Sequence, residues 1–288
     1  MHDNNWVDRN EYPFEDHYLD LEMGRMHFVD EGKGRPIVMV HGTPEWSFGY
    51  RNLIKGLSKN FRCIACDHIG FGLSDKPADW SYLPEAHAKN LNDLIESLNL
   101  EDLTLIVHDY GGPIGLSYAS NHPENIHSLV LMNTWMWSLK NDSHFLGTQL
   151  FGGAVGRFLY EQMSFSARVL LPSAMSNQSK LTRAIHQQYL KPWRTAEERH
   201  GTWVFARELI GSSDWYDSLW QKRACIQNIT ALILWGMKDF AFRKIELKKI
   251  KTMFHYETVQ TFENTGHFVS EELGNNLIPI VDYFLEEV

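Results

Sequence analysis

The sequence predicts an α/β fold, with a mostly parallel, doubly wound sheet and a helical segment inserted between two strands. Three observations support this prediction. Apolar runs of strand length recur along the chain, they alternate with stretches of helical periodicity, and the alternation stops between about residues 135 and 228. Nearly continuous apolar runs are typical of strands covered on both faces, and strand–helix alternation is typical of parallel sheets.

Six segments are expected to form strands because they are apolar and bounded by turn residues. The expected strands are 36–42, 61–67, 103–109, 127–133, 230–236 and 256–263. Two helices have the clearest patterns. Residues 84–100 place leucine and isoleucine on one face at intervals of three and four, and residues 277–288 repeat this pattern, with Pro279 near the helix start.

Residues 135–228 are expected to form a helical cap between two parts of one core, residues 1–134 and 229–288. The cap segment has helical and aromatic stretches but no convincing strand pattern. Ligands of doubly wound sheets bind outside the carboxyl ends of the strands. A cap that leaves the sheet at one of those ends would cover such a site and exclude water.

The composition is that of an ordinary globular protein. The 288 residues are 43% hydrophobic and 22% charged, and the net charge is −9 without a basic run. Nucleic acid and membrane surfaces are therefore not expected as partners. The first residues are polar and acidic, and no apolar stretch approaches the length of about 18 residues that a membrane-spanning helix needs. We expect a cytoplasmic protein, and the oligomeric state is left open.

The three cysteines do not suggest a disulfide framework in a chain of this length. Cys63 and Cys66 have the C-x2-C spacing of some metal sites, but they lie within an expected buried strand. No second pair or nearby histidine completes a metal site. The C-x2-C pair is therefore expected to be structural.

The stretch VHDYGG (107–112) places an acidic residue where a strand turns into a helix. A nucleophile elbow has this form, with one reactive side chain on a tight turn and small residues around it. Asp109 would be the nucleophile, and Gly111 and Gly112 would let the helix approach closely. The motif alone is equally compatible with a simple helix N-cap.

Two further residues favour a catalytic role for Asp109. Asp239 follows the expected strand 230–236, and His267 follows the expected strand 256–263. Nucleophile, acid and histidine in this chain order are typical of α/β-hydrolase triads. Because all three residues follow strands, a parallel sheet would bring them to one edge. We predict that Asp109, Asp239 and His267 form a catalytic triad.

An oxyanion hole is expected beside Asp109. In this fold it uses the backbone N–H after the nucleophile and one from the loop after an earlier strand. The stretch HGTPEW (41–46) supplies that loop, so the N–H groups of Tyr110 and Thr43 are the candidates. Asp67 and Asp75, in the glycine-rich stretch 67–77, are assigned to structure.

An aspartate nucleophile suits displacement at an sp3 carbon. Its attack expels a leaving group and forms an alkyl ester. His267 can then deprotonate a water that attacks the ester carbonyl of Asp109, while the amides of Thr43 and Tyr110 hold the oxyanion. The substrate would thus be held covalently on Asp109.

The motifs resemble those of haloalkane dehalogenases, an α/β-hydrolase family. The resemblance rests on HGTPEWSFGYRNLIKGLSKNFRCIACDHIGFGLSDKP, VHDYGGPIGLSYA, LVLMNTWMW, WGMKDFAF and TGHFVSEE, with PWRTAEERHGTWVFARE in the cap. It implies the α/β-hydrolase fold, displacement of halide from small apolar haloalkanes with water as co-substrate, and no cofactor or metal. It also supports Asp239 as the acid, because Asn133 and Thr134 occupy the alternative acid position and cannot serve.

Two positions depart from the family pattern. The family usually has a tryptophan after the nucleophile, whose indole N–H binds halide, and here this residue is Tyr110. The loop residue that is commonly asparagine is Thr43. Tyr110, Trp135 and Trp137 are therefore the candidate leaving-group contacts, and the cap residues Trp193 and Trp203 are further possibilities.

Other functions remain open. An epoxide hydrolase would need two cap tyrosines facing Asp109, for which Tyr160, Tyr189 and Tyr216 are candidates. Another α/β hydrolase with a different substrate is compatible with the same fold. A non-catalytic ligand receptor that retains the triad is the alternative from a different class.

Overall fold

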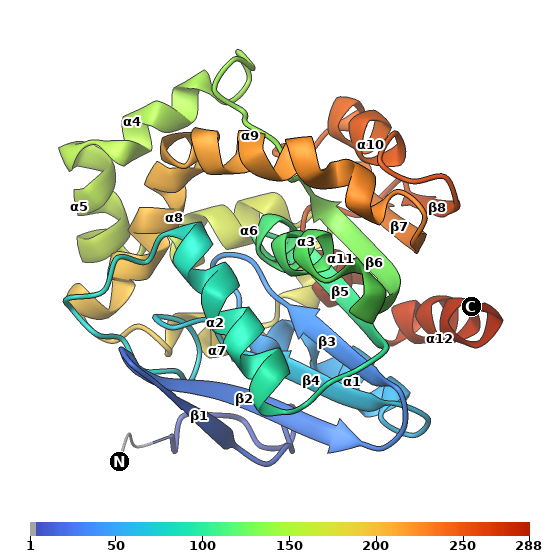
Figure 1. The fold of residues 1–288 in the computed structure, drawn as a ribbon. Coiled ribbons are helices and arrows are strands. Elements are labelled where there is room, and N and C mark those ends of the chain that lie inside the picture. The colour runs from blue at the N-terminus through green and yellow to red at the C-terminus, as the bar shows by residue number, and fades with distance from the viewer. Residues whose placement is uncertain (1–3) are drawn as a thin grey trace.

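The computed structural model describes residues 4–288, and its centre is one eight-stranded sheet (Figure 1). The strand order is β1-β2-β4-β3-β5-β6-β7-β8. From β4 across to β8 the neighbouring strands are parallel, whereas β1 and β2 join the edge in antiparallel fashion. The strands are β1 (His17–Leu21), β2 (Gly24–Gly32), β3 (Pro36–Val40), β4 (Arg62–Cys66), β5 (Leu103–Asp109), β6 (Ile126–Thr134), β7 (Thr230–Gly236) and β8 (Glu257–Phe262).

Helices cover both faces of the sheet and one end of it. They are α1 (Arg51–Leu57), α2 (Pro84–Ser97), α3 (Gly111–Asn121), α4 (Gln149–Gly152), α5 (Ala154–Met163), α6 (Leu171–Ala174), α7 (Arg183–Leu190), α8 (His200–Gly211), α9 (Ser213–Lys222), α10 (Lys244–Lys251), α11 (Val269–Leu273) and α12 (Ile278–Glu287). Within residues 4–288, no helix is long and apolar enough to cross a membrane.

The six expected strands are confirmed, with shifts of at most two residues at their ends. The helices α2 and α12 are also confirmed, and Pro279 lies in the first turn of α12, where its missing N–H costs no hydrogen bond. The strands β1 and β2 were missed. Both are partly exposed at the sheet edge and carry charged residues, so they lack the continuous apolar pattern of the central strands.

The core consists of two apolar layers, one on each face of the sheet. Alternate residues of β5 point into opposite layers, with Leu105 in one and Ile106 in the other. The first layer packs against α2 and α3, which lie in front of the strands in Figure 1, and the second against α1 and α12. This is the doubly wound arrangement predicted from the sequence.

The segment between β6 and β7 folds entirely into helices and connecting loops, as the inserted cap was expected to do. Its helices, among them α4, α5 and α8, lie beyond the end of the sheet to which the parallel strands point (Figure 1). The cap thus stands over the strand ends, where a doubly wound sheet binds its ligands.

The C-x2-C pair lies in β4, as expected. Cys63 and Cys66 are both buried. Burial raises the pKa of each thiol to about 12, and nearby carboxylates act in the same direction. Both thiols are therefore protonated at neutral pH, and they serve as small apolar residues of the core.

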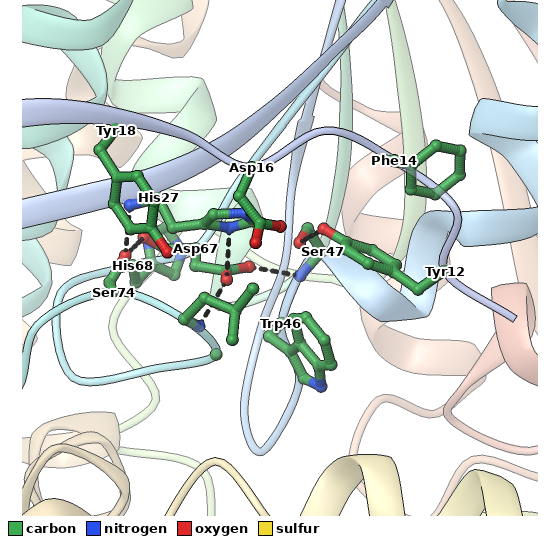
Figure 2. A network of polar contacts seen from close by, with 12 residues as sticks. Tyr12, Phe14, Asp16, Tyr18, His27, Trp46, Ser47, Asp67, His68 and Ser74 are labelled. Carbon is green, nitrogen blue, oxygen red and sulfur yellow. Dashed lines mark hydrogen bonds and ion pairs between the residues drawn. The ribbon is translucent and has the colours of Figure 1, made fainter. Parts of the chain in front are cut away.

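A buried charged network ties the N-terminal segment to the strand ends of the core (Figure 2). Asp67, just after β4, accepts hydrogen bonds from the backbone N–H groups of Ser47 at 2.7 Å and Leu73 at 2.8 Å. Its other partner is the ring of His27 in β2, whose Nδ1 lies 2.8 Å from Oδ2 of Asp67. The opposite nitrogen of His27 lies 3.3 Å from Asp16. The sequence-based assignment of Asp67 to structure agrees with these contacts.

His27 and the carboxylates around it shift one another's pKa towards the charged forms. Burial alone would lower the pKa of His27, but the carboxylates of Asp67 and Asp16 raise it above its ordinary value. Burial alone would raise the pKa of Asp67, but the charge and hydrogen bond of His27 hold it below its ordinary value. Removal of one partner therefore leaves a buried charge without full compensation.

Replacement of Asp67 by asparagine is expected to lower the free energy of unfolding by about 3 kcal/mol or more, because the charge opposite His27 is lost. Urea denaturation at pH 7 measures this change. Asp217→Ala, which removes a half-exposed partner of Lys140, is the control and should leave the midpoint nearly unchanged. A shift no larger than that of the control would show that the network does not stabilise the fold.

Candidate active site

Asp109 is the last residue of β5, and its backbone has a left-handed φ of +47°. Such a φ is rare for residues other than glycine and is typical of strained functional turns. The Thr134 hydroxyl donates a hydrogen bond of 2.6 Å to the Asp109 carbonyl oxygen. A Cβ at Gly111 would lie 1.9 Å from the carbonyl oxygen of Val40, and one at Gly112 would lie 1.7 Å from Oγ1 of Thr134. Only glycines allow α3 to start this close to the sheet.

The structure brings the other two predicted triad residues to Asp109. His267 lies in the loop between β8 and α11, and Asp239 lies after β7. Nδ1 of His267 is 2.8 Å from Oδ2 of Asp239, and Nε2 is 3.9 Å from Oδ2 of Asp109. The second distance exceeds that of a hydrogen bond, so Nε2 is not committed to Asp109. All three residues are about 6% exposed.

The charges of the site shift its titration. Burial alone would lower the pKa of His267, but the carboxylates of Asp239 and Asp109 raise it well above its ordinary value. Burial alone would raise the pKa of Asp239. His267 together with the Ala241 N–H and the Asn133 amide instead holds that pKa below its ordinary value. Asp239 is therefore ionised and keeps the proton on the facing nitrogen of His267.

The two predicted amide donors belong to the loop after β3 and to the residue that follows Asp109. The N–H of Thr43, in the loop after β3, donates a hydrogen bond of 3.0 Å to Oδ2 of Asp109. Tyr110 is the N-cap of α3, so its N–H is among the amides that a helix leaves without an intrahelical acceptor. The Thr43 amide thus already binds the Asp109 carboxylate, and the Tyr110 amide remains free of the helix; donors of this kind can hold negative charge.

Asn133, to which the sequence analysis gave no role, supports the acid. Its Nδ2 donates to Oδ2 of Asp239 at 2.8 Å and to the carbonyl oxygen of Gly236 at 3.1 Å. Its Oδ1 accepts a hydrogen bond of 2.7 Å from the N–H of Gly236. Asn133 therefore joins the ends of β6 and β7 and fixes the orientation of the Asp239 carboxylate.

A second carboxylate–histidine pair, not predicted from the sequence, lies beneath the first. Oε2 of Glu45 is 2.6 Å from Nδ1 of His108, and Nε2 of His108 is 2.8 Å from the carbonyl oxygen of His267. Burial alone would raise the pKa of Glu45, but the neighbouring His108 holds it below its ordinary value. This pair anchors the loop that carries His267. Its sequence signals were the polar residues Glu45 and His108 within otherwise apolar surroundings.

Asp109 lies on the floor of a cavity of about 270 Å³ between the core and the cap. Its wall is mostly apolar, with Phe145, Phe151, Leu170, Phe205, Phe242 and Phe268. Thr43, Tyr110 and His267 also line it. Across residues 4–288, no group of three or more histidine, cysteine, aspartate or glutamate side chains is arranged to hold a metal ion.

Tyr110 lines this cavity, but its hydroxyl is already occupied. The phenol donates a short hydrogen bond to the carbonyl oxygen of Phe205 in α8. The two rings also stack, with centroids 4.2 Å apart and an angle of 13° between their planes. The hydroxyl that made Tyr110 a candidate leaving-group contact is therefore already bound to the cap.

Trp135 and Trp137 are not among the described residues that line the cavity. The Trp135 ring stacks on Phe242, with centroids 5.0 Å apart, and its edge faces Tyr110, so it lies behind the wall. Trp137 packs against Trp220. Large aromatic rings bury much area, so these two indoles pack into the protein. The sequence alone did not show whether they would point into the cavity or away from it.

The indoles of the cap are also outside the cavity wall. Trp193 donates its N–H to the carbonyl oxygen of Gly70, and Trp203 donates to that of Phe151. Neither belongs to the described residues that line the cavity. The three cap tyrosines differ from one another: the hydroxyl of Tyr189 donates to Glu271, that of Tyr216 donates to the Glu208 carbonyl, and Tyr160 lines the cavity.

Comparisons with known proteins identify relatives of this chain. The chain is 33% identical over 96% of its length to a cis-3-alkyl-4-alkyloxetan-2-one decarboxylase from Shewanella oneidensis, of which the match covers 89%. It is 30% identical to haloalkane dehalogenase 2 from Mycobacterium bovis, over 92% of this chain and 93% of that one. The structure of a putative ancestral haloalkane dehalogenase matches with a TM-score of 0.86 at 22% identity and covers 94% of this chain and 98% of that one.

The similarity to haloalkane dehalogenases expected from the motifs is confirmed, and the similarity to a decarboxylase was not anticipated. A family model described as the alpha/beta hydrolase fold matches residues 35–272. This range includes Thr43, Asp109, Asp239 and His267. By its sequence, its sheet topology and the strand-end positions of these residues, the chain belongs to the α/β-hydrolase fold family.

Proposed function

We propose that this protein is a hydrolase in which Asp109 displaces a leaving group from an sp3 carbon, most specifically halide from a small haloalkane. The observation that carries the proposal is the position of the Asp109 carboxylate. It lies between the Thr43 amide and His267, at the floor of an apolar cavity. A carboxylate in this place is suited to attack a carbon that an apolar substrate presents from above.

In the first step an oxygen of Asp109 attacks the carbon that bears the halogen. A carbon–oxygen bond forms, the carbon–halogen bond breaks, and the halide leaves with the electron pair of that bond. The product is an alkyl ester of Asp109. The apolar wall favours this step because a poorly solvated carboxylate is a stronger nucleophile than one in water.

In the second step His267 takes a proton from water, and the resulting hydroxide attacks the carboxyl carbon of the ester. The negative charge on the tetrahedral intermediate falls on the oxygen held by the amides of Thr43 and Tyr110. Collapse of this intermediate releases the alcohol and restores the Asp109 carboxylate. Asp239 stabilises the imidazolium form of His267 while it holds the proton.

The charge on Asp109 coordinates the two steps. In the free enzyme this charge contributes to the raised pKa of His267. Ester formation removes the charge, so the pKa of His267 falls towards the value that Asp239 alone maintains. His267 is therefore a better base when the ester is present than before it forms.

A second candidate reaction is the decarboxylation of an oxetan-2-one, the reaction for which the Shewanella relative is named. The specific observation in its favour is that Trp135 and Trp137 are not on the cavity wall, while the Tyr110 hydroxyl is bound to Phe205. None of these three groups is therefore available to stabilise a free halide, whereas relief of ring strain would assist the opening of a four-membered lactone.

The same nucleophile serves this reaction without water. Asp109 would attack the ring carbon that bears the oxygen, and the carbon–oxygen bond would break to leave a carboxylate on the adjacent carbon. Loss of CO2 then forms the carbon–carbon double bond and expels the carboxylate of Asp109. The products are an alkene and CO2, and neither His267 nor water is consumed.

Asp109→Asn is expected to abolish halide release from short bromo- and chloroalkanes, because the amide cannot act as the nucleophile. His267→Gln is expected to release no more than one halide per enzyme and to gain the mass of the alkyl group. Halide assay and mass spectrometry of the intact protein measure both effects.

With a cis-dialkyl oxetan-2-one, alkene formation that persists in His267→Gln but not in Asp109→Asn would favour decarboxylation.

The wild-type protein is the reference for this panel. Release of halide that continues in Asp109→Asn would contradict the proposed nucleophile. If the wild-type protein converts neither haloalkanes nor oxetan-2-ones, both candidate reactions are wrong.

Hydrolysis of the alkyl ester is expected to accelerate as the pH rises through the pKa of His267, because only the neutral imidazole accepts a proton from water. Asp239→Asn removes a charge that raises this pKa, so the midpoint should move to lower pH. The plateau rate should also fall by about 10³- to 10⁴-fold, because the asparagine no longer orients the imidazole correctly. Single-turnover decay of the ester, followed by mass spectrometry, measures both values. An unchanged midpoint in Asp239→Asn would contradict the assigned pairing.

A further inference from the structure

The polar groups on the cavity wall fall into two classes. Several already have partners: the hydroxyl of Tyr110 donates to Phe205, that of Thr148 donates to Phe145, and the ring of His144 contacts the Phe240 carbonyl. In the described part of the chain, the hydroxyls of Tyr160 and Ser166 have no hydrogen-bond partner, although both residues are buried and line the cavity. A hydroxyl that lines a cavity and has no partner in the protein can donate its hydrogen bond to a molecule bound there.

Tyr160 is positioned by packing rather than by its hydroxyl. It lies in α5 of the cap and is 5% exposed. Its ring packs against Phe151 and Phe165, with centroid distances of 5.9 Å to each. Burial raises the pKa of Tyr160, and the charge of Asp109 acts in the same direction. The phenol therefore stays protonated, as a hydrogen-bond donor requires, and it lies within the electrostatic reach of Asp109.

Ser166 completes this side of the wall. It is the first residue of a π-helical turn, Ser166–Leu170, that follows α5 after a left-handed residue at Ser164. Such turns re-aim side chains and are frequent at functional sites. Tyr160 and Ser166 thus belong to one short segment of the cap and line the same cavity.

The direction in which Asp109 would attack its substrate indicates what the cap segment with Tyr160 and Ser166 faces. Asp109 attacks from the core side of the cavity, and displacement requires the leaving group to depart on the side opposite the nucleophile. The leaving group therefore moves towards the cap. Within the described residues, the hydroxyl of Thr43 also has no partner. Thr43 lies in the core beside Asp109, to which its N–H donates, and so on the side from which the nucleophile attacks.

On the basis of the proposed function, we infer that the hydroxyls of Tyr160 and Ser166 form the leaving-group site of this protein and take the place of indole N–H donors. As the bond to carbon breaks, its electron pair stays with the leaving atom, and Tyr160 donates a hydrogen bond to the charge that forms there. The proton remains on Tyr160 when the leaving group is a halide. A departing carboxylate of an opened lactone offers two oxygens, one for each hydroxyl.

Tyr160→Phe tests this inference in the His267→Gln protein, in which the ester accumulates and alkylation is measured without hydrolysis. The ring and its packing against Phe151 and Phe165 are retained. Alkylation by 1-chlorobutane should slow about ten-fold or more, because hydrogen bonds to charged groups are worth at least that factor. The loss should be smaller for 1-iodobutane, because iodide leaves with less assistance. Ser166→Ala should also slow alkylation by 1-chlorobutane more than alkylation by 1-iodobutane, but both losses should be smaller than in Tyr160→Phe.

Tyr256→Phe, at an exposed tyrosine outside the cavity, is the matched control and should alkylate at the parent rate. The rate at which Tyr160→Phe consumes a cis-dialkyl oxetan-2-one is also compared with the rate of its parent protein. Equal rates in Tyr160→Phe and its parent, or an equal loss for chloride and iodide, would overturn the leaving-group site while leaving Asp109 as the nucleophile.

A further measurement separates this inference from the proposed function. If no substrate reacts with the parent protein, the proposed function fails, and calorimetric titration with sodium bromide then tests the site alone. Bromide binding that is weakened at least ten-fold in Tyr160→Phe would support an anion site without displacement. Equal binding in both proteins, or no binding in either, would overturn the inference as well.

Discussion

The left-handed backbone of Asp109 is the constraint on which the rest of the site depends. This conformation costs about 1–3 kcal/mol and persists only where the surroundings determine it. The Thr134 hydroxyl donates a hydrogen bond to the carbonyl oxygen of Asp109. Gly111 and Gly112 let the chain pass so close to the sheet that a side chain at either position would collide with it. The core therefore stabilises a turn that its own local preferences disfavour. As a result, the Asp109 carboxylate lies at the end of the sheet and lines the cavity below the cap.

The remaining site residues are held by buried charges rather than by apolar packing. Asp239 orients His267 from one side and is itself fixed by Asn133. Glu45 and His108 hold the carbonyl of the same histidine from below. Each charge lies in a low-dielectric setting, where a paired group is favourable and an unpaired one is costly. The histidine thus has a fixed position although it lies in a loop.

The sequence was sufficient for the central sheet and for the triad positions, because both follow from local patterns. Buried strands are continuously apolar, and a parallel sheet places every strand end at one edge. The direction of Trp135 and the role of Asn133 could not be predicted in the same way. Both depend on which strands become neighbours and on the space between them. The spacing of residues along the sequence does not specify either of these. The edge strands β1 and β2 were missed because half-exposed strands lack a continuous apolar pattern.

The contact between Tyr110 and Phe205 also joins the cap to the core. Lifting α8 from the core would break the hydrogen bond and separate two stacked rings beside the nucleophile. The opposite rim is different, since His144 and Phe240 line the cavity and are exposed. Rotation of the His144 ring breaks one hydrogen bond, the one to the backbone carbonyl oxygen of Phe240. Movement of these exposed side chains therefore disturbs fewer contacts than lifting the cap helix α8 from the core.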